Sequence, residues 1–341
     1  MAQRMKAAVV RAFRAPLVIE EMAVPSPKDG QILVKYEASG VCHTDLHAAS
    51  GDWPVKPNPP FVPGHEGVGF VAGVGAGVKR VKEGDRVGVP WLHSACGYCP
   101  YCRTGWETLC ASQSNTGYSV NGTFAQFGLA DPDFVAGLPG SLDFGPAAPV
   151  LCAGVTVYKG LKETEVRPGE WVAISGVGGL GHMAVQYAKA MGMHVVAADI
   201  FEDKLALAKK LGADITVNGK DQDAIEQVQR ATGGVHGALV TAVSPIAMEQ
   251  AFGFMRSKGT MALVGLPPGK ISLPVFETVL KRITVRGSIV GTRQDLEESL
   301  QFAAEGKVVP HFRWDELENV NDIFRRMDEG KIDGRIVMRL Q

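Results

Sequence analysis

The sequence predicts a protein of two parts, an irregular all-β unit and an α/β unit built on a doubly wound parallel sheet. The chain has 341 residues, which corresponds to about two domains of roughly 150 residues each. Short alternating strand patterns with frequent turn residues fill the first stretch, and strand and helix patterns alternate regularly in the second. These two patterns are typical of different fold classes, so the expected fold is α/β plus β.

The first stretch, residues 1–152, is rich in glycine, proline and valine, and residues 32–36 and 67–72 are typical of its short strands. The chain from about residue 291 has two amphipathic helical patterns and a strand at 335–340, too little to build a core of its own. We therefore expect a first domain of residues 1–152 completed by 291–341.

The second domain is expected over residues 153–290, where a parallel sheet with helices on both faces is predicted. The predicted strands are 171–175, 194–199, 215–218, 237–243 and 260–264. The predicted helices are 179–191, 202–211, 223–231 and 245–256.

Charge and composition narrow the class of protein. The chain has 35 Lys+Arg against 36 Asp+Glu and no basic run, so a nucleic-acid partner is not expected. No apolar run is long enough for a membrane helix, and residues 1–6 are not followed by the apolar region of a signal peptide. The sequence therefore predicts a cytoplasmic protein without a membrane partner.

A glycine-rich loop follows the predicted strand 171–175 and opens the next helix. Its residues are Gly176, Val177, Gly178, Gly179, Leu180 and Gly181. The first glycine permits a tight turn, the second admits a pyrophosphate, and the third lets helix and strand pack closely, as in Rossmann dinucleotide sites. Asp199, at the end of the next strand, suits the ribose hydroxyls of NAD and disfavours the phosphate of NADP. The alternative is an ordinary glycine-rich turn with Asp199 as a helix cap.

The six cysteines favour metal ligation over three disulfides, because disulfide-dense chains are small and secreted. Four have the spacing C-x2-C-x2-C-x7-C, and they are Cys96, Cys99, Cys102 and Cys110. Such steps let four thiolates close around one structural zinc ion. An iron–sulfur cluster is the rival interpretation of the same pattern.

Cys42 and Cys152 remain, with His65 between them in the chain. Two thiolates and one imidazole form a three-ligand zinc set that leaves a fourth position open for catalysis. Taken singly, each residue has a structural alternative, since a lone buried cysteine is usually a small hydrophobe.

These motifs together resemble the zinc-containing alcohol dehydrogenases of the medium-chain dehydrogenase family, over essentially the whole chain. The resemblance rests on Gly64–Gly67, Cys42–Asp45, the four-cysteine loop and the glycine loop 176–181. It implies a GroES-like β-barrel catalytic domain beside the Rossmann domain, with NAD and two zinc ions per chain. It also implies reversible oxidation of short primary alcohols to aldehydes by a homotetramer, as in the bacterial and yeast-type enzymes.

The resemblance also implies catalytic roles. The ligands of the catalytic zinc would be Cys42, His65 and Cys152. Glu66 resembles the carboxylate that approaches the zinc during ligand exchange, and Asp45 the carboxylate that orients the ligating histidine. Thr44 resembles the hydroxyl that accepts the alcohol proton, and His47 the far end of that relay.

Further positions resemble cofactor contacts and pocket walls. His43 and Arg335 match pyrophosphate contacts and Lys204 a ribose contact. The segment beside the nicotinamide would be Val264, Gly265 and Leu266. Trp53 and Trp91 resemble the aromatic walls of the alcohol pocket; the alternative is that they are ordinary aromatic core residues.

Two groups of rival functions remain open at this stage. Related enzymes reduce cinnamyl-type aldehydes with NADP, or oxidise polyols, threonine or the formaldehyde–glutathione adduct. Non-enzymatic alternatives are a nucleotide-binding redox sensor, a lens-type structural relative, and a four-cysteine nucleic-acid module.

Overall fold

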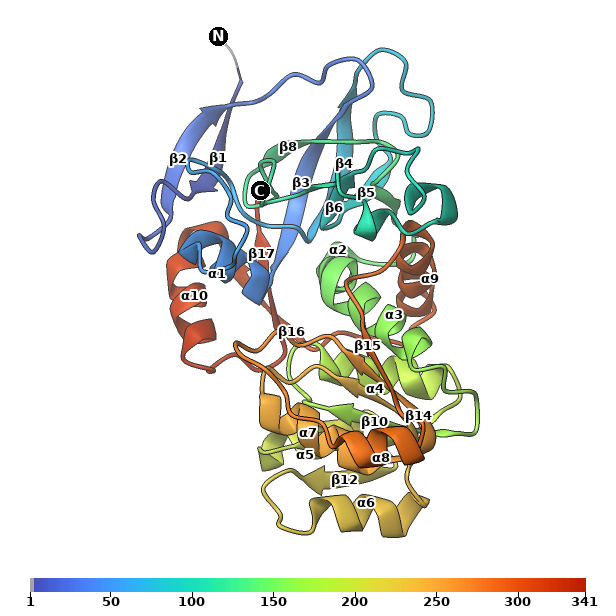
Figure 1. The fold of residues 1–341 in the computed structure, drawn as a ribbon. Helices are drawn as coiled ribbons and strands as arrows, with labels where there is room; N and C mark the ends of the chain where they lie inside the picture. The colour runs from blue at the N-terminus through green and yellow to red at the C-terminus, as the bar shows by residue number, and fades with distance from the viewer. Residues whose placement is uncertain (1–2) are drawn as a thin grey trace. The chain divides into compact units, whose positions relative to one another are not determined.

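The computed structural model describes residues 3–341, which form two compact units (Figure 1). The first unit comprises the chain to Cys152 together with Thr292–Ala304 and Pro310–Gln341. The second comprises Ala153–Gly291 and Glu305–Val309. The short segment Glu305–Val309 thus groups with the second unit, although it was expected in the first. Residues 1 and 2, at the start of the expected first domain, lie outside the described residues.

A mainly antiparallel sheet organises the first unit, in the order β16-β17-β3-β4-β5-β9, with β8 also paired to β3. Its strands are β3 (Ile32–Val41), β4 (Gly67–Val74), β5 (Arg86–Val89), β8 (Phe127–Ala130), β9 (Ala136–Gly137), β16 (Phe312–Glu316) and β17 (Arg335–Arg339). Two smaller pairs are β1 (Arg4–Val9) with β2 (Val18–Ala23), and β6 (Leu92–Ser94) with β7 (Ser114–Asn115).

Strand β3 joins distant parts of the first unit. Alternate residues along it, including Ile32, Val34 and Tyr36, are buried, as expected for a strand with one face on a core. Its antiparallel partner β17 comes from the end of the chain and sets Ile336 opposite Val41. In Figure 1 the blue β3 and the red β17 accordingly lie side by side.

The helices of the first unit are α1 (His43–Ser50), α2 (Phe144–Pro149), α9 (Arg293–Ala304) and α10 (Val320–Asp328). Helix α1 lies inside the stretch predicted as all-β. It starts directly after β3 and ends at Gly51, whose φ of 62° is a left-handed conformation that glycine adopts readily. Because α1 begins directly after β3 and ends at Gly51, the side chains of its first turn lie next to the end of β3.

A six-stranded parallel sheet forms the second unit, in the order β12-β11-β10-β13-β14-β15. Its strands are β10 (Trp171–Ser175), β11 (His194–Asp199), β12 (Ile215–Asn218), β13 (Val235–Val240), β14 (Met255–Leu263) and β15 (Thr284–Gly287). Its helices are α3 (Val155–Glu163), α4 (Gly181–Ala190), α5 (Glu202–Lys210), α6 (Ala224–Thr232), α7 (Pro245–Phe254) and α8 (Val275–Leu280). From β10 the chain adds β11 and β12 on one side, and then crosses to add β13 on the other side of β10. Sheets of this kind bind ligands at such a switch point, at the carboxyl ends of the strands.

The predicted fold class is confirmed, and the expected alternation of strands and helices forms a parallel sheet. The sixth strand, β15, was not predicted, because its four residues are mostly exposed and carry no buried alternation. Within residues 3–341, no helix combines the length and the apolar character needed to cross a bilayer.

Candidate functional site

The first cluster of site residues is built at the start of α1. Cys42 directly follows β3 and occupies the N-cap position of the helix. Asp45 lies three residues later, and its Oδ2 accepts a hydrogen bond of 2.9 Å from the Cys42 amide. A carboxylate in the first turn satisfies an amide that has no partner within the helix, so it fixes the backbone that carries the Cys42 thiol.

The other oxygen of Asp45 orients His65. Asp45 Oδ1 lies 2.8 Å from His65 Nδ1 and accepts a second hydrogen bond of 3.2 Å from the Gly64 amide. A carboxylate oxygen accepts, so the Nδ1–H of His65 donates to Asp45 and Nε2 is left as the ring nitrogen that faces the cysteines. That Nε2 lies 3.2 Å from Cys152 Sγ. Asp45 and His65 are each 1% exposed, so bulk water does not compete for these bonds.

Cys152 reaches the same point from a π-helical turn, Val150–Gly154. Its Sγ is 3.9 Å from Cys42 Sγ, too far for a disulfide. Sulfurs at two corners of a tetrahedron around zinc, about 2.3 Å from the ion, would lie about 3.8 Å apart. The hydrogen bond between the thiols lowers the pKa of Cys42 well below its ordinary value and raises that of Cys152. The spacing and the donor atoms therefore fit zinc.

Glu66 completes this centre with a carboxylate that is fully buried. One ligand atom from each of Cys42, His65, Glu66 and Cys152 lies within 4.8 Å of all the others. Glu66 Oε1 accepts a short hydrogen bond from Arg335, whereas Oε2 has no partner within residues 3–341. Burial raises the pKa of Glu66 to about 7, against the opposing pull of the Arg335 charge.

Close packing holds Glu66 in this position. A Cβ at residue 40 would lie 1.9 Å from Glu66 Oε2, so a larger residue there would displace the Glu66 carboxylate. Arg335, expected as a pyrophosphate contact, is 4% exposed, and its guanidinium is paired with Glu66. In this structure Arg335 is thus part of the metal centre's surroundings.

The expected relay residues lie on the same helix. Thr44 and His47 are three residues apart on α1 and therefore share a face. His47 Nδ1 is 3.1 Å from both oxygens of Asp52, and Trp53 stacks on its ring at 5.1 Å. His43, the first residue of α1, is exposed.

The two predicted pocket tryptophans lie next to site residues. Trp53 stacks on His47, and Trp91 meets the His65 ring edge-on at 5.2 Å. Both side chains are half-buried and pack against the hydrophobic core of the first unit, so their role as pocket walls stays a prediction.

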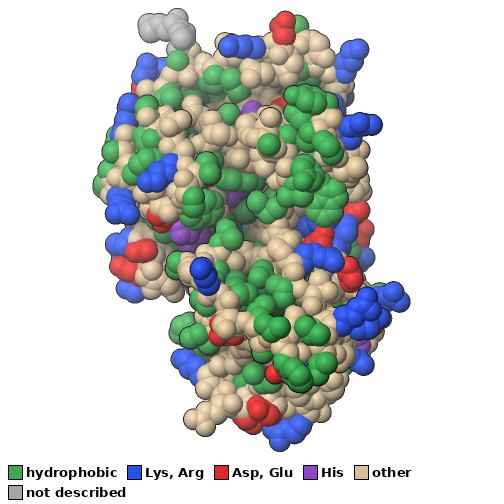
Figure 2. Space-filling model, viewed as in Figure 1, with side chains coloured by type: hydrophobic (Ala, Val, Ile, Leu, Met, Phe, Trp, Pro, Cys, Tyr) green, Lys and Arg blue, Asp and Glu red, His purple; other side chains and the backbone are tan. Residues whose placement is uncertain are grey.

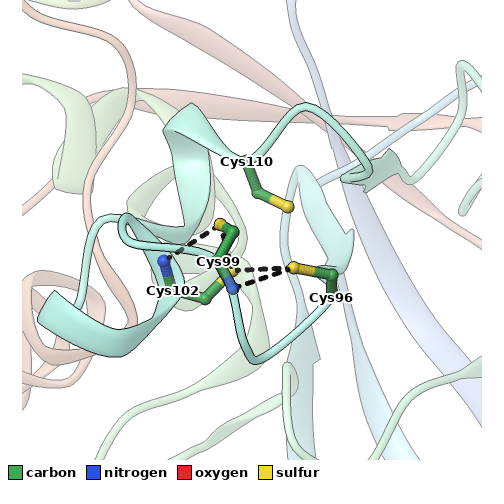
Figure 3. Close-up of side chains that lie close together, drawn as sticks. All are labelled: Cys96, Cys99, Cys102 and Cys110. Atoms are coloured by element: carbon green, nitrogen blue, oxygen red, sulfur yellow. Dashed lines mark hydrogen bonds between the residues drawn. The ribbon is translucent and has the colours of Figure 1, made fainter.

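The four remaining cysteines point their sulfurs toward one another (Figure 3). Cys102 Sγ lies 3.8 Å from Cys96 Sγ and 3.5 Å from Cys99 Sγ, and all six cysteines of the chain are free thiols. The Cys99 amide donates a hydrogen bond to Cys96 Sγ, and the Cys102 amide donates one to Cys99 Sγ. A hydrogen bond from the Tyr98 backbone is the main cause that lowers the pKa of Cys96 to about 7. This closed four-thiolate geometry fits a structural zinc ion.

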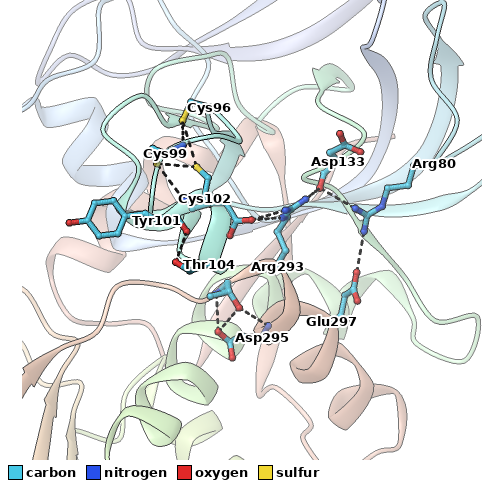
Figure 4. A network of polar contacts seen from close by, with 12 residues as sticks. Arg80, Cys96, Cys99, Tyr101, Cys102, Thr104, Asp133, Arg293, Asp295 and Glu297 are labelled. Atoms are coloured by element: carbon cyan, nitrogen blue, oxygen red, sulfur yellow. Dashed lines mark hydrogen bonds and ion pairs between the residues drawn. The ribbon is translucent and has the colours of Figure 1, made fainter.

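An ion-pair network ties this cysteine lobe to α9 (Figure 4). The buried Glu107, three residues before Cys110, accepts hydrogen bonds of 3.1 and 2.6 Å from Arg293. Arg293 and Arg80 both donate to the carbonyl of Asp133, and Arg80 pairs with Glu297 on α9. The lobe is therefore anchored to the segment that returns to the first unit at Thr292.

The second unit carries the glycine loop at the carboxyl end of β10. Gly176 has a φ of 91°, and a Cβ on Gly181 would lie 1.8 Å from the Gly176 carbonyl, so both positions require glycine. Space is open where a Cβ on Gly178 would lie. The amides of Gly178, Gly179 and Leu180 have no acceptor in the described chain. Free amides before α4 and an open approach fit a bound pyrophosphate.

The Asp199 side chain, at the end of β11, binds the backbone of the glycine loop. Its Oδ2 accepts from the Val177 amide at 2.7 Å, and its Oδ1 accepts from the amides of Ile200 and Phe201. Lys204 lies over the Phe201 ring with its Nζ 4.7 Å from the centroid. Residues 264–266 follow β14, where the Val264 and Gly265 amides donate to the Val240 carbonyl and Leu266 is exposed.

Three features of the site were not predicted from the sequence. They are the Asp52 contact with His47, the Glu107–Arg293 pair, and Tyr118, which lies between Trp53 and Trp91. Asp52 could have been found from the sequence, because a glycine cap at Gly51 turns the chain back onto the helix. The other two contacts join residues that are far apart in the chain and leave no local pattern.

Comparison with known proteins gives two family models that match consecutive parts of the chain. The "Alcohol dehydrogenase GroES-like domain" matches residues 28–140, and the "Zinc-binding dehydrogenase" model matches residues 179–305. An alcohol dehydrogenase of Rhizobium meliloti is 78% identical over 98% of this chain and 99% of its own length.

Solved structures show the same likeness. The alcohol dehydrogenase of Aeropyrum pernix is 34% identical with a TM-score of 0.89, over 98% of this chain and 99% of that one. The acetophenone reductase of Geotrichum candidum, solved in complex with NAD, is 28% identical with a TM-score of 0.88 and covers 99% of this chain and 98% of its own.

Asp45→Asn tests how the first metal centre is held. The amide keeps the size of the side chain but cannot accept with both atoms, so the His65 ring loses its fixed orientation. We expect zinc affinity at this centre to fall about 10–100-fold, while the four-cysteine cluster keeps its metal. Chelator competition with metal analysis measures this. The exposed Asp143→Asn serves as control, and an Asp45→Asn protein that binds both metals undiminished would contradict the assignment.

Proposed function

Because the chain belongs to the zinc-containing alcohol dehydrogenases of the medium-chain dehydrogenase family, we propose that it oxidises short primary alcohols reversibly to aldehydes with NAD as hydride acceptor. One observation carries this proposal above the others. Cys42, His65 and Cys152 converge in a buried cluster, and the ring of His65 is oriented by Asp45. A three-ligand set of this kind leaves room for an exchangeable oxygen ligand.

The proposal includes two zinc ions per chain, one at this centre and one held by the four-cysteine lobe. The donor atoms and their spacing support both. When bound, the zinc at the first centre supplies Lewis acidity that makes an alcohol easier to deprotonate, and NAD supplies the hydride acceptor. A metal closed in by four thiolates has no open position and serves the structure of the lobe.

The residues of α1 have the task of moving the alcohol proton. The Thr44 hydroxyl accepts it while giving up its own proton, and His47 takes that proton on toward solvent, since its ring is part-exposed and pairs with the exposed Asp52. Trp53 and Trp91 limit the size of the alcohol and exclude water. Glu66, with one unpartnered buried oxygen, is placed to approach the metal during ligand exchange.

We propose NAD in preference to NADP as the cofactor. The Asp199 carboxylate lies beside the glycine loop, where its negative charge repels a ribose phosphate. Lys204 is proposed to support the ribose side, whereas Arg335, expected as a pyrophosphate contact, is buried against Glu66 and is not assigned to the cofactor. The Val264–Leu266 backbone is proposed to line the nicotinamide.

We also propose a homotetramer. Helix α8 exposes Val275, Phe276, Val279 and Leu280, each between 67% and 76% exposed. The neighbouring β15 is the edge strand of the sheet, and hydrophobic side chains gather over the region of α8 in Figure 2. An edge strand beside an apolar helix is suited to pairing with its own copy around a two-fold axis. Six free thiols fit a reducing compartment such as the cytoplasm.

Initial rates with a panel of alcohols test the proposed activity. We expect NADH formation with a higher kcat/KM for 1-propanol than for cyclohexanol, because two indole rings narrow the pocket. We also expect a higher kcat/KM with NAD than with NADP. The proposal is wrong if cyclohexanol is the better substrate, or if the two cofactors serve equally.

Cys152→Ser tests the division of labour between the two cysteine groups. We expect a folded protein that keeps one zinc ion per chain and has lost turnover. Cys99→Ser, the matched control, should instead lose the lobe's zinc and unfold at a lower temperature, because structural zinc contributes to folding. Metal analysis and thermal unfolding measure both. A fully active or an unfolded Cys152→Ser protein would refute this division.

Light scattering of the purified protein tests the assembly. We expect the mass of a tetramer, and a smaller species when Phe276 and Val279 are changed to Asp, because the charges disrupt an apolar interface. Val55→Asp places the same charge at an exposed valine outside α8 and serves as control. A monomer in dilute solution would contradict the proposal.

A further inference from the structure

The tyrosine ring of Tyr118 lies between the two tryptophans of the proposed pocket. Its centroid is 6.0 Å from that of Trp53 and 5.5 Å from that of Trp91, both within the range of favourable aromatic pairs. The two tryptophans in turn contact His47 and His65. The rings thus form one continuous row, His47–Trp53–Tyr118–Trp91–His65.

The backbone of Tyr118 is fixed against the metal centre. The Thr116 amide donates to the Trp91 carbonyl at 2.9 Å, and the Tyr118 amide donates to Asn115 at 3.2 Å. Gly117, with a φ of 73°, packs so closely that a Cβ there would lie 2.4 Å from the carbonyl oxygen of Gly64. This turn is therefore seated on the residue directly before His65.

The hydroxyl end of Tyr118 is fixed as well. It donates a short hydrogen bond to the carbonyl of Val55, two residues after Trp53. The Val55 side chain is 75% exposed, whereas Tyr118 is 9% exposed. Tyr118 thus holds the Trp53 segment, which lies at the surface, at a set distance from Trp91.

We propose that Tyr118 is a positioning residue that determines which alcohols fit, by keeping Trp53 and Trp91 apart and in place. The inference rests on the proposed function, since it concerns the pocket that these tryptophans would line. Tyr118 itself needs no contact with the substrate. Removing its ring leaves a space between the indoles, and either indole can then move into it and widen the pocket.

The expected result is a change in selectivity. One methylene in an apolar pocket alters kcat/KM by about 10-fold or more, so in Tyr118→Ala the ratio of kcat/KM for cyclohexanol to that for 1-propanol should rise at least about 10-fold. Tyr118→Phe keeps the ring that separates the indoles and loses only the hydrogen bond to the Val55 carbonyl, so the ratio should rise much less than in Tyr118→Ala. Trp314→Ala, which removes another part-exposed aromatic of the first unit, should also leave the ratio unchanged.

A triple variant, compared with the Trp53→Ala/Trp91→Ala double variant, separates positioning from general loosening of the fold. If Tyr118 acts through the tryptophans, then Tyr118→Ala should change the ratio little once Trp53 and Trp91 are already alanine. Near-ultraviolet circular dichroism of the substrate-free protein gives a second readout. Its aromatic bands should weaken in Tyr118→Ala and be retained in Tyr118→Phe.

The inference is overturned if Tyr118→Ala leaves the ratio and the aromatic bands unchanged, or if Tyr118→Phe shifts them as much as alanine does. The prediction concerns a change in the ratio, so it holds whichever alcohol the unaltered chain prefers. A chain that prefers cyclohexanol would refute the proposed function alone. A chain without any activity would still be tested through the aromatic bands.

Discussion

The buried carboxylate of Asp45 accepts hydrogen bonds from the Cys42 amide, the Gly64 amide and the His65 ring. Two segments 20 residues apart in the chain are thereby held around one point. A charged group at 1% exposure is costly to bury unless its oxygens are satisfied, and here three donors satisfy it. The geometry of the buried Cys42–His65–Cys152 cluster depends on this arrangement, because it aims both the Cys42 thiol and the His65 Nε2 inward.

Around this point the first unit brings together reactive side chains from distant parts of the chain. Cys152 comes from a π-helical turn, Glu66 from the residue after His65, and Arg335 from the last strand. The Arg335–Glu66 pair exists because β17 lies beside β3, so this late strand extends the sheet and also places a positive charge against a buried carboxylate. The four-cysteine lobe is anchored separately through Glu107 and Arg293. The two clusters of candidate metal ligands therefore have independent supports within one unit.

Local patterns in the sequence predicted much of this. The alternation of apolar runs predicted five of the six parallel strands, and ligand spacing predicted which cysteines lie together. The rest depends on contacts without a local signal. Helix α1 was hidden because a short capped helix inside a strand-rich stretch has no apolar repeat, and β15 because its residues are exposed. Tyr118 and Arg335 find their partners only through the tertiary fold, and the roles of the individual site residues were taken from a family resemblance.

The most direct test of the central claim is the coordination of zinc in the protein as purified, measured by anomalous diffraction at the zinc edge. We expect two zinc ions per chain. One should have four sulfur ligands, from Cys96, Cys99, Cys102 and Cys110, and the other two sulfurs, one imidazole nitrogen and one exchangeable oxygen. An ion at the second site whose ligands do not include Cys42, His65 and Cys152, or a second site that takes up no zinc, would contradict it.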